Sequence, residues 1–134
     1  MTVLIDASLF YAYSNIRDVH HLKAKEILKD ILSDKYGGYL TTDYIFDEVV
    51  TVTERKTDKQ NSLEIGNFIL NSSILIAEID KSVFNEAWKV FQETKNLSFT
   101  DCTNIAFMRI FGIEKIATFD KGFKGINGIE VVDK

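Results

Sequence analysis

Short apolar runs rich in β-branched residues recur along the chain, and segments with helical spacing separate them. The run 2–5 is followed at once by Asp6, and the run 115–119 is followed at once by Asp120. Further strand candidates lie at 39–41, 74–79 and 130–132. Runs without polar alternation are typical of strands buried on both faces of a parallel sheet.

Amphipathic helices fill the intervals between these runs. Apolar residues recur at helical spacing over 19–34, and again over a segment that Thr42 or Asp43 can cap and that ends near Lys56. A further helix is expected over 61–71. Another should begin at Asp80 or Ser82, and its inward-facing residues should be Val83, Ala87, Val90 and Phe91. A last helix should run from a cap at Thr100 to Gly112. The alternation predicts a three-layer α/β/α sandwich around a central parallel sheet of four to five strands, in a single domain over 1–134.

Composition bears on compartment and partners. The chain has one cysteine, no basic segment at its N-terminus, and no apolar run near the roughly 20 residues that a membrane helix needs. We therefore expect a cytoplasmic protein with no membrane contact. The net charge of −4, from 16 basic and 20 acidic residues, is not the basic balance typical of nucleic-acid binders. A metal site can hold a substrate phosphate in place of a basic surface.

Four carboxylates occupy positions that favour a shared site. Asp6 and Asp120 follow strands, and ligands of open parallel sheets bind beyond the carboxyl ends of the strands. Asp101 lies at a helix start, and Glu48 lies about 40° outside the buried arc of its helix. Each acid alone has an ordinary explanation as a solvated or capping residue. Together they would repel one another without a divalent cation, and oxygen ligands select Mg²⁺ or Mn²⁺.

Four short motifs, in this order, resemble those of the PIN-domain ribonucleases found as VapC toxins in VapBC toxin–antitoxin pairs. They are Leu4-Ile5-Asp6-Ala7-Ser8, Asp47-Glu48-Val49, Ser98-Phe99-Thr100-Asp101-Cys102, and Ala117-Thr118-Phe119-Asp120-Lys121-Gly122-Phe123. The first motif alone is weak and the last is moderately specific, but the ordered set covers residues 2–132. The departures are Cys102, where a small residue such as Ala is common, and the acidic net charge.

The resemblance implies a PIN-like sheet in which the strands that precede Asp6 and Asp120 are neighbours. It implies Mg²⁺ or Mn²⁺ held by Asp6, Glu48, Asp101 and Asp120, with the hydroxyls of Ser8 and Thr118 supporting the site. It also implies cleavage of single-stranded or looped RNA, homodimerisation, and inhibition by a small antitoxin protein. The predicted function is therefore that of a metal-dependent endoribonuclease acting as the toxin of a VapBC-type pair.

Other residue types support this prediction less directly. His20 and His21 are the only histidines, and their place at a helix start favours surface or capping roles over catalysis. Cys102 lacks a basic partner and is expected to be a small buried residue. Aromatic residues after the first motif either stack on RNA bases or pack the first helix or a dimer surface. They are Phe10, Tyr11 and Tyr13.

Two alternatives remain open at this stage. A metal-dependent phosphatase on a similar sheet would need a second acid two residues after its aspartyl nucleophile, where this chain has Ser8, or a lysine at a strand end. A catalytically silent PIN-fold module that binds RNA or protein should have lost some of the acids, whereas this chain keeps all four. The sequence thus favours the endoribonuclease.

Overall fold

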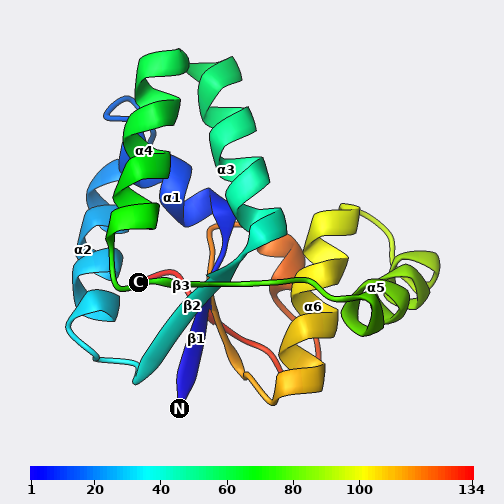
Figure 1. The fold of residues 1–134 in the computed structure, drawn as a ribbon. Helices are drawn as coiled ribbons and strands as arrows, with labels where there is room; N and C mark the ends of the chain where they lie inside the picture. Colours follow the sequence, from blue (N-terminus) through cyan, green and yellow to red (C-terminus); the bar gives the residue numbers. More distant parts are fainter.

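Five parallel strands form the central sheet of the structure, a computed structural model that describes residues 1–134 (Figure 1). They are β1 (Thr2–Ile5), β2 (Gly38–Thr42), β3 (Leu75–Ala77), β4 (Lys115–Ala117) and β5 (Glu130–Val132). The strand order is β3-β2-β1-β4-β5, so the chain first builds outward on one side of β1 and then returns to its other side. The switch point therefore lies between β1 and β4, where Ile5 is paired with Ala117.

Helices cover both faces of this sheet, which confirms the predicted three-layer architecture. They are α1 (Ala7–Ser14), α2 (His21–Leu32), α3 (Asp43–Lys56), α4 (Lys59–Asn71), α5 (Lys81–Glu93) and α6 (Phe99–Phe111). Figure 1 shows α2 on one side of the sheet, α5 and α6 on the other, and α3 and α4 as a hairpin that projects past the strand ends. None of the helices is long and apolar enough to cross a membrane.

The helix starts follow local hydrogen bonding, and one of them differs from the prediction. Thr42 caps α3, because its hydroxyl accepts a bond from the Ile45 backbone N–H at 3.1 Å. The cap of α6 is Ser98 and not Thr100. Ser98 and Asp101 exchange two bonds of 3.0 Å, each side chain accepting from the other residue's backbone N–H. This reciprocal capping box places Thr100 inside the first turn.

Three further expectations about strands and packing were wrong in detail. The segment 74–79 pairs only over Leu75–Ala77 and lies at the sheet edge, where Leu75 is 64% exposed. Strand β4 ends at Ala117, so Asp120 lies on a turn and does not directly follow the strand. Phe91 on α5 is 38% exposed and does not face inward, because Val83, Ala87 and Val90 already form the buried stripe of that helix.

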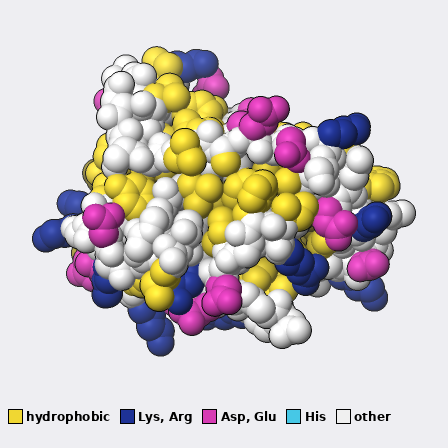
Figure 2. All heavy atoms as spheres, turned by 60° about the horizontal axis from the view of Figure 1, so that its bottom comes forward, with side chains coloured by type: hydrophobic (Ala, Val, Ile, Leu, Met, Phe, Trp, Pro, Cys, Tyr) yellow, Lys and Arg dark blue, Asp and Glu magenta, His cyan; other side chains and the backbone are white.

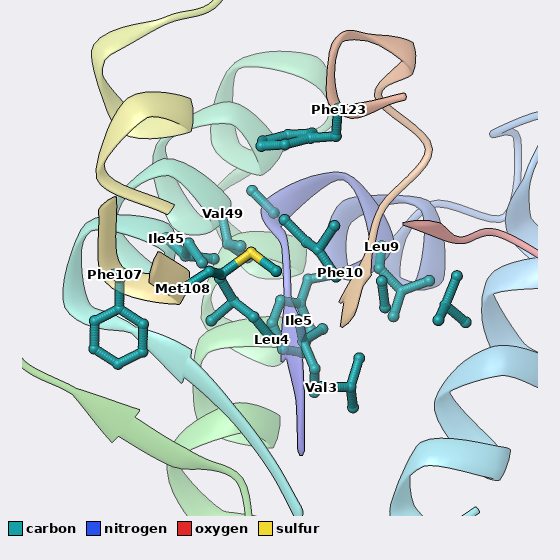
Figure 3. Packing of buried hydrophobic residues seen from close by; sticks show 14 of the residues in the cluster. Val3, Leu4, Ile5, Leu9, Phe10, Ile45, Val49, Phe107, Met108 and Phe123 are labelled. Carbon is teal, nitrogen blue, oxygen red and sulfur yellow. The ribbon is translucent and has the colours of Figure 1, made fainter. Parts of the chain in front are cut away.

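Strand β1 lies at the centre of the core. Figure 3 shows Val3, Leu4 and Ile5 enclosed by side chains from α1, α3 and α6, and all three residues are fully buried. Burying each such side chain contributes about 1.5–3 kcal/mol to folding. The strand is thus firmly held, and it fixes the position of the residue that follows it, Asp6.

Candidate active site at the carboxyl ends of the strands

Asp6 is the most deeply buried acid at the switch point, with only 3% of its surface exposed. Its backbone N–H donates to the Ala117 carbonyl at 3.0 Å, which continues the β1–β4 pairing by one residue. Thr118 donates its hydroxyl to Asp6 Oδ2 at 2.7 Å, and the Asn104 amide donates to Asp6 Oδ1 at 3.1 Å. Both carboxylate oxygens are therefore oriented by neutral donors, and no ion pair offsets the charge.

A chain of hydroxyls ties the turn after β4 to the start of α1. The Ser8 hydroxyl accepts a bond from the Phe119 N–H at 2.9 Å and lies 3.0 Å from the Thr118 hydroxyl. Thr118 also accepts from the Asp120 N–H at 3.0 Å. Because the one hydroxyl proton of Thr118 goes to Asp6, Ser8 must donate to Thr118. The two residues expected to support the site thus connect the backbone of Asp120 to the side chain of Asp6.

Asp101 lies in the first turn of α6, and Asp120 begins the short turn that follows β4. Asp101 is 8% exposed, and its carboxylate is engaged in the capping box with Ser98. Burial raises its pKa, the bonds to Ser98 oppose the rise, and the nearby charge of Asp120 adds to it. Asp120 accepts a bond from the Gly122 N–H at 2.8 Å, which fixes the turn that carries it. Asp101 and Asp120 thus each cap a helix or turn and also lie near the other acids of the site.

Glu48 completes the group from the direction of α3. The side chain is half-buried, as its place at the edge of the buried arc predicted, and its neighbour Asp47 is exposed. Burial raises the pKa of Glu48 to about 7, and the charges of Asp6, Asp101 and Asp120 contribute to the rise. Burial likewise raises the pKa of Asp6 to about 6, against the bond from Thr118 and with the help of Asp101 and Asp120. The structure therefore brings all four predicted acids within electrostatic range of one another.

Three observations bear on whether this group fits a divalent ion. None of the four acids takes part in an ion pair. The atoms that these acids offer to a metal are all oxygens, which is the ligand type that Mg²⁺ and Mn²⁺ prefer. The Asn104 Oδ1 atom is also buried beside Asp6 without a partner. The side chains as placed do not set three or more acidic or histidine groups at metal-ligand spacing. The chemistry of the group fits a hard cation, and ligation would have to draw the carboxylates closer together.

Asn104 is the residue at this site that the sequence analysis missed. It is fully buried on α6, three residues after Asp101, within the buried stretch 101–108. The sequence did contain a signal for it, because Asn104 is a lone amide among buried residues and lies about one helical turn after the candidate acid Asp101. Its target, Asp6, depends on how α6 packs against β1, which the helix periodicity alone does not give.

The histidines and the cysteine lie outside the carboxylate group. His20 precedes α2 without a capping bond, and its ring stacks on Phe119 at 4.4 Å between centroids. His21 Nδ1 forms a hydrogen bond of 2.9 Å with the Ala12 carbonyl. Cys102 is buried as expected, and burial raises the pKa of its thiol.

Comparison with known proteins assigns the family. The PIN domain family model matches residues 3–129. A VapC ribonuclease of Archaeoglobus fulgidus is 30% identical over 104 residues, which cover 75% of this chain and 66% of that relative. The 23S rRNA-specific endonuclease VapC20 of Mycobacterium tuberculosis is 24% identical over 131 residues, covering 96% of this chain and 97% of the relative. This chain belongs to the PIN-domain family.

Solved structures agree on the fold. The crystal structure of M. tuberculosis VapC20, described as a sarcin–ricin loop cleaving toxin, superposes with a TM-score of 0.80 at 21% identity. The match covers 89% of this chain and 90% of that chain. A toxin–antitoxin complex from Klebsiella pneumoniae superposes with a TM-score of 0.65 at 19% identity, covering 97% and 95% of the two chains.

Proposed function

We propose that this chain is a Mg²⁺- or Mn²⁺-dependent endoribonuclease that acts as the toxin of a VapBC-type pair, with residues 1–134 as one nuclease domain. The observation that carries the proposal is the group of four mutually interacting, unpaired carboxylates at the switch point of the sheet. The names of the relatives, a VapC ribonuclease and a 23S rRNA-specific endonuclease, support RNA as the substrate class.

Asp6, Glu48, Asp101 and Asp120 would hold the ion. When bound, a divalent ion promotes ionisation of water near neutral pH and shields the charge that develops on the leaving oxygen. The chain's own contribution is orientation. Thr118 and Asn104 fix the rotamer of Asp6, and the capping box fixes that of Asp101.

The positions of the histidines bear on the products of cleavage. His20 stacks on Phe119 and His21 bonds to Ala12, so no histidine pair is placed to activate a 2′-hydroxyl. A water nucleophile that attacks in line expels the 3′-oxygen and leaves a 5′-phosphate and a 3′-hydroxyl. Looped RNA should be cleaved faster than duplex, because bases in loops are free to leave the helix.

The direct test is cleavage of end-labelled RNA with product analysis. We expect cleavage to stop in EDTA and to return with Mg²⁺ or Mn²⁺. Products that carry 2′,3′-cyclic phosphates, or full activity in EDTA, would refute the proposed chemistry.

Replacement of Asn104 tests how Asp6 is held. Asn104→Ala removes the donor to Asp6 Oδ1 and should weaken Mn²⁺ binding about 10- to 100-fold, as loss of partners that orient metal ligands generally does. Isothermal titration with Mn²⁺ compares Asn104→Ala with the wild type without reference to activity. Equal Mn²⁺ affinity in the wild type and Asn104→Ala would show that the amide does not position a ligand.

Assembly follows from the same family assignment. We propose a cytoplasmic protein that forms homodimers and is bound by a small antitoxin. Figure 2 shows apolar side chains gathered in a band across one face, and exposed apolar residues include Leu75 at 64%, Trp88 at 52% and Phe111 at 56%. Apolar areas of this kind often mark protein interfaces. Light scattering at micromolar concentration should give twice the mass of one chain, and a monomer would contradict the dimer.

A further inference from the structure

A polar groove lies between the end of α1 and the tip of the α3–α4 hairpin. The connection from α1 to α2 faces the α3–α4 turn there, around a cavity of about 480 Å³ (Figure 1). Its walls include Asn15, Arg17, Lys56, Thr57 and Asn61, and Ile16 is the only hydrophobic residue among them. The groove therefore offers hydrogen-bond donors and positive charge but little surface for an apolar side chain to bury.

This groove reaches the carboxylate group through Tyr11. A smaller depression lined by Tyr11 and Thr53 shares Lys56 and Thr57 with the larger cavity, so the two lie next to each other. The phenol of Tyr11 lies within electrostatic range of Glu48, Asp6, Asp101 and Asp120. Lys56 Nζ stands 5.2 Å from the centre of the Tyr11 ring. The cavity, Lys56, Tyr11 and the acids thus follow one another from the groove to the carboxylate group.

The charges along this path are free to bind an anion. Arg17 and Lys56 are exposed, and neither belongs to any of the ion pairs of the protein. The two acids that line the groove and the depression, Asp18 and Asp58, each accept a hydrogen bond from a backbone N–H. Asp18 accepts a bond from the His20 N–H at 2.8 Å, and Asp58 accepts one from the Asn61 N–H at 2.7 Å as the cap of α4.

We propose that the RNA strand cut at the carboxylates continues through this groove, where Lys56 and Arg17 hold phosphates that flank the scissile bond. The inference rests on the proposed function, because it takes the carboxylates as the point of cleavage. The side-chain amides of Asn15 and Asn61 can donate to phosphate oxygens. The Thr57 hydroxyl donates its proton to the Thr53 carbonyl at 2.7 Å and can still accept from a 2′-hydroxyl. Neither kind of contact selects one particular base. The larger cavity thus sets two cations, Arg17 and Lys56, against one acid, Asp58, in a chain whose net charge is −4.

The test measures RNA binding separately from cleavage. Arg17→Gln and Lys56→Gln are introduced singly and together into the Asp120→Asn protein. Binding of a labelled single-stranded RNA is followed by fluorescence anisotropy in EDTA, from about 50 to about 200 mM salt. At the lower salt we expect each replacement to weaken binding about threefold, as loss of an exposed charge contact does. The slope of log K against log salt should become shallower by about 0.7 for each cation removed.

Matched controls use exposed cations outside the groove and outside any ion pair. Lys29→Gln on α2 and Arg109→Gln on α6, in the same Asp120→Asn protein, remove equal charge and should leave both affinity and slope nearly unchanged. Thermal unfolding of each variant confirms that it remains folded. Equal losses in the groove and control variants would mean that only net charge matters, and would overturn the proposal.

Further outcomes separate this proposal from the proposed function. An unchanged slope in the double variant, or no RNA binding by the Asp120→Asn protein, overturns the groove and leaves the carboxylate chemistry standing. Failure of the wild type to cleave RNA contradicts the function, whereas a shallower slope in the groove variants still shows that Lys56 and Arg17 bind RNA phosphates. If the double variant binds RNA normally but loses binding of a cognate antitoxin, the groove belongs to a protein partner and the proposal is wrong.

Discussion

Replacing Asp120 by Asn is expected to lower the rate of RNA cleavage by about a thousandfold or more while the protein stays folded. Loss of a ligand that positions a catalytic ion removes several kcal/mol of transition-state stabilisation, and each ~1.4 kcal/mol changes the rate tenfold. The fold should tolerate the change, because an Asn carbonyl can still accept the Gly122 N–H bond that Asp120 accepts at 2.8 Å. Removing one charge also relieves repulsion on Glu48 and Asp6.

Adjacent residues on α3 provide the matched control. Glu48→Gln should reduce cleavage as strongly as Asp120→Asn, since Glu48 interacts with all three aspartates of the group. Asp47 is the residue before Glu48, and its side chain is exposed. Asp47→Asn removes the same charge as Glu48→Gln, but it should change the rate by no more than about twofold, because solvent screens the exposed charge. Single-turnover cleavage and a thermal melt measure the two effects. Similar rates for Glu48→Gln and Asp47→Asn would remove Glu48 from the proposed site.

The architecture was predictable because buried parallel strands and amphipathic helices leave different spacings in the sequence. Strand β1 was predicted with the same bounds that the structure shows, since Thr2–Ile5 is apolar and a charged residue ends it. Element ends were harder. Ser98 and Thr100 are both acceptable caps by residue type, and the choice depended on the reciprocal bonds between Ser98 and Asp101. The end of β4 depended on pairing with β5, which residue type does not encode.

The grouping of the acids was predictable in part for a similar reason. Parallel strands bring their carboxyl ends to one edge of a sheet, so Asp6 and the turn that carries Asp120 had to lie near each other once β1 and β4 were neighbours. The contact of Asn104 with Asp6 and the path from Tyr11 to Lys56 were not predictable. Both depend on how helices distant in sequence turn their faces toward one another.

The metal-free protein should become less stable as the pH rises from about 4 to about 7. Asp6 and Glu48 have pKa values of about 6 and about 7 in the folded state, above their ordinary values near 4. In this interval the folded protein binds more protons than the unfolded chain, so the free energy of unfolding falls with increasing pH. For buried Asp6 the difference corresponds to at most about 3 kcal/mol, and half-buried Glu48 contributes less because solvent screens it.

A divalent ion should reverse this loss. Asp6→Asn should remove most of the response to the ion and the part of the pH-dependent loss that comes from Asp6. An ion that binds only the folded state adds about 2.7 kcal/mol at a concentration 100 times its Kd, or roughly 10 °C in Tm for a chain of this size. The gain should be larger at about pH 8 than at about pH 5, because carboxylates bind metal in their deprotonated form.

The fold should accommodate Asp6→Asn, since the unpartnered Asn104 Oδ1 can accept a hydrogen bond from the new amide after a flip of the Asn104 side chain. Thermal melts with Mn²⁺ and with EDTA at both pH values measure the response, and Asp47→Asn should behave as the wild type. If Asp6→Asn gains as much from Mn²⁺ as the wild type does at about pH 8, Asp6 is not a ligand and the proposed metal site is wrong.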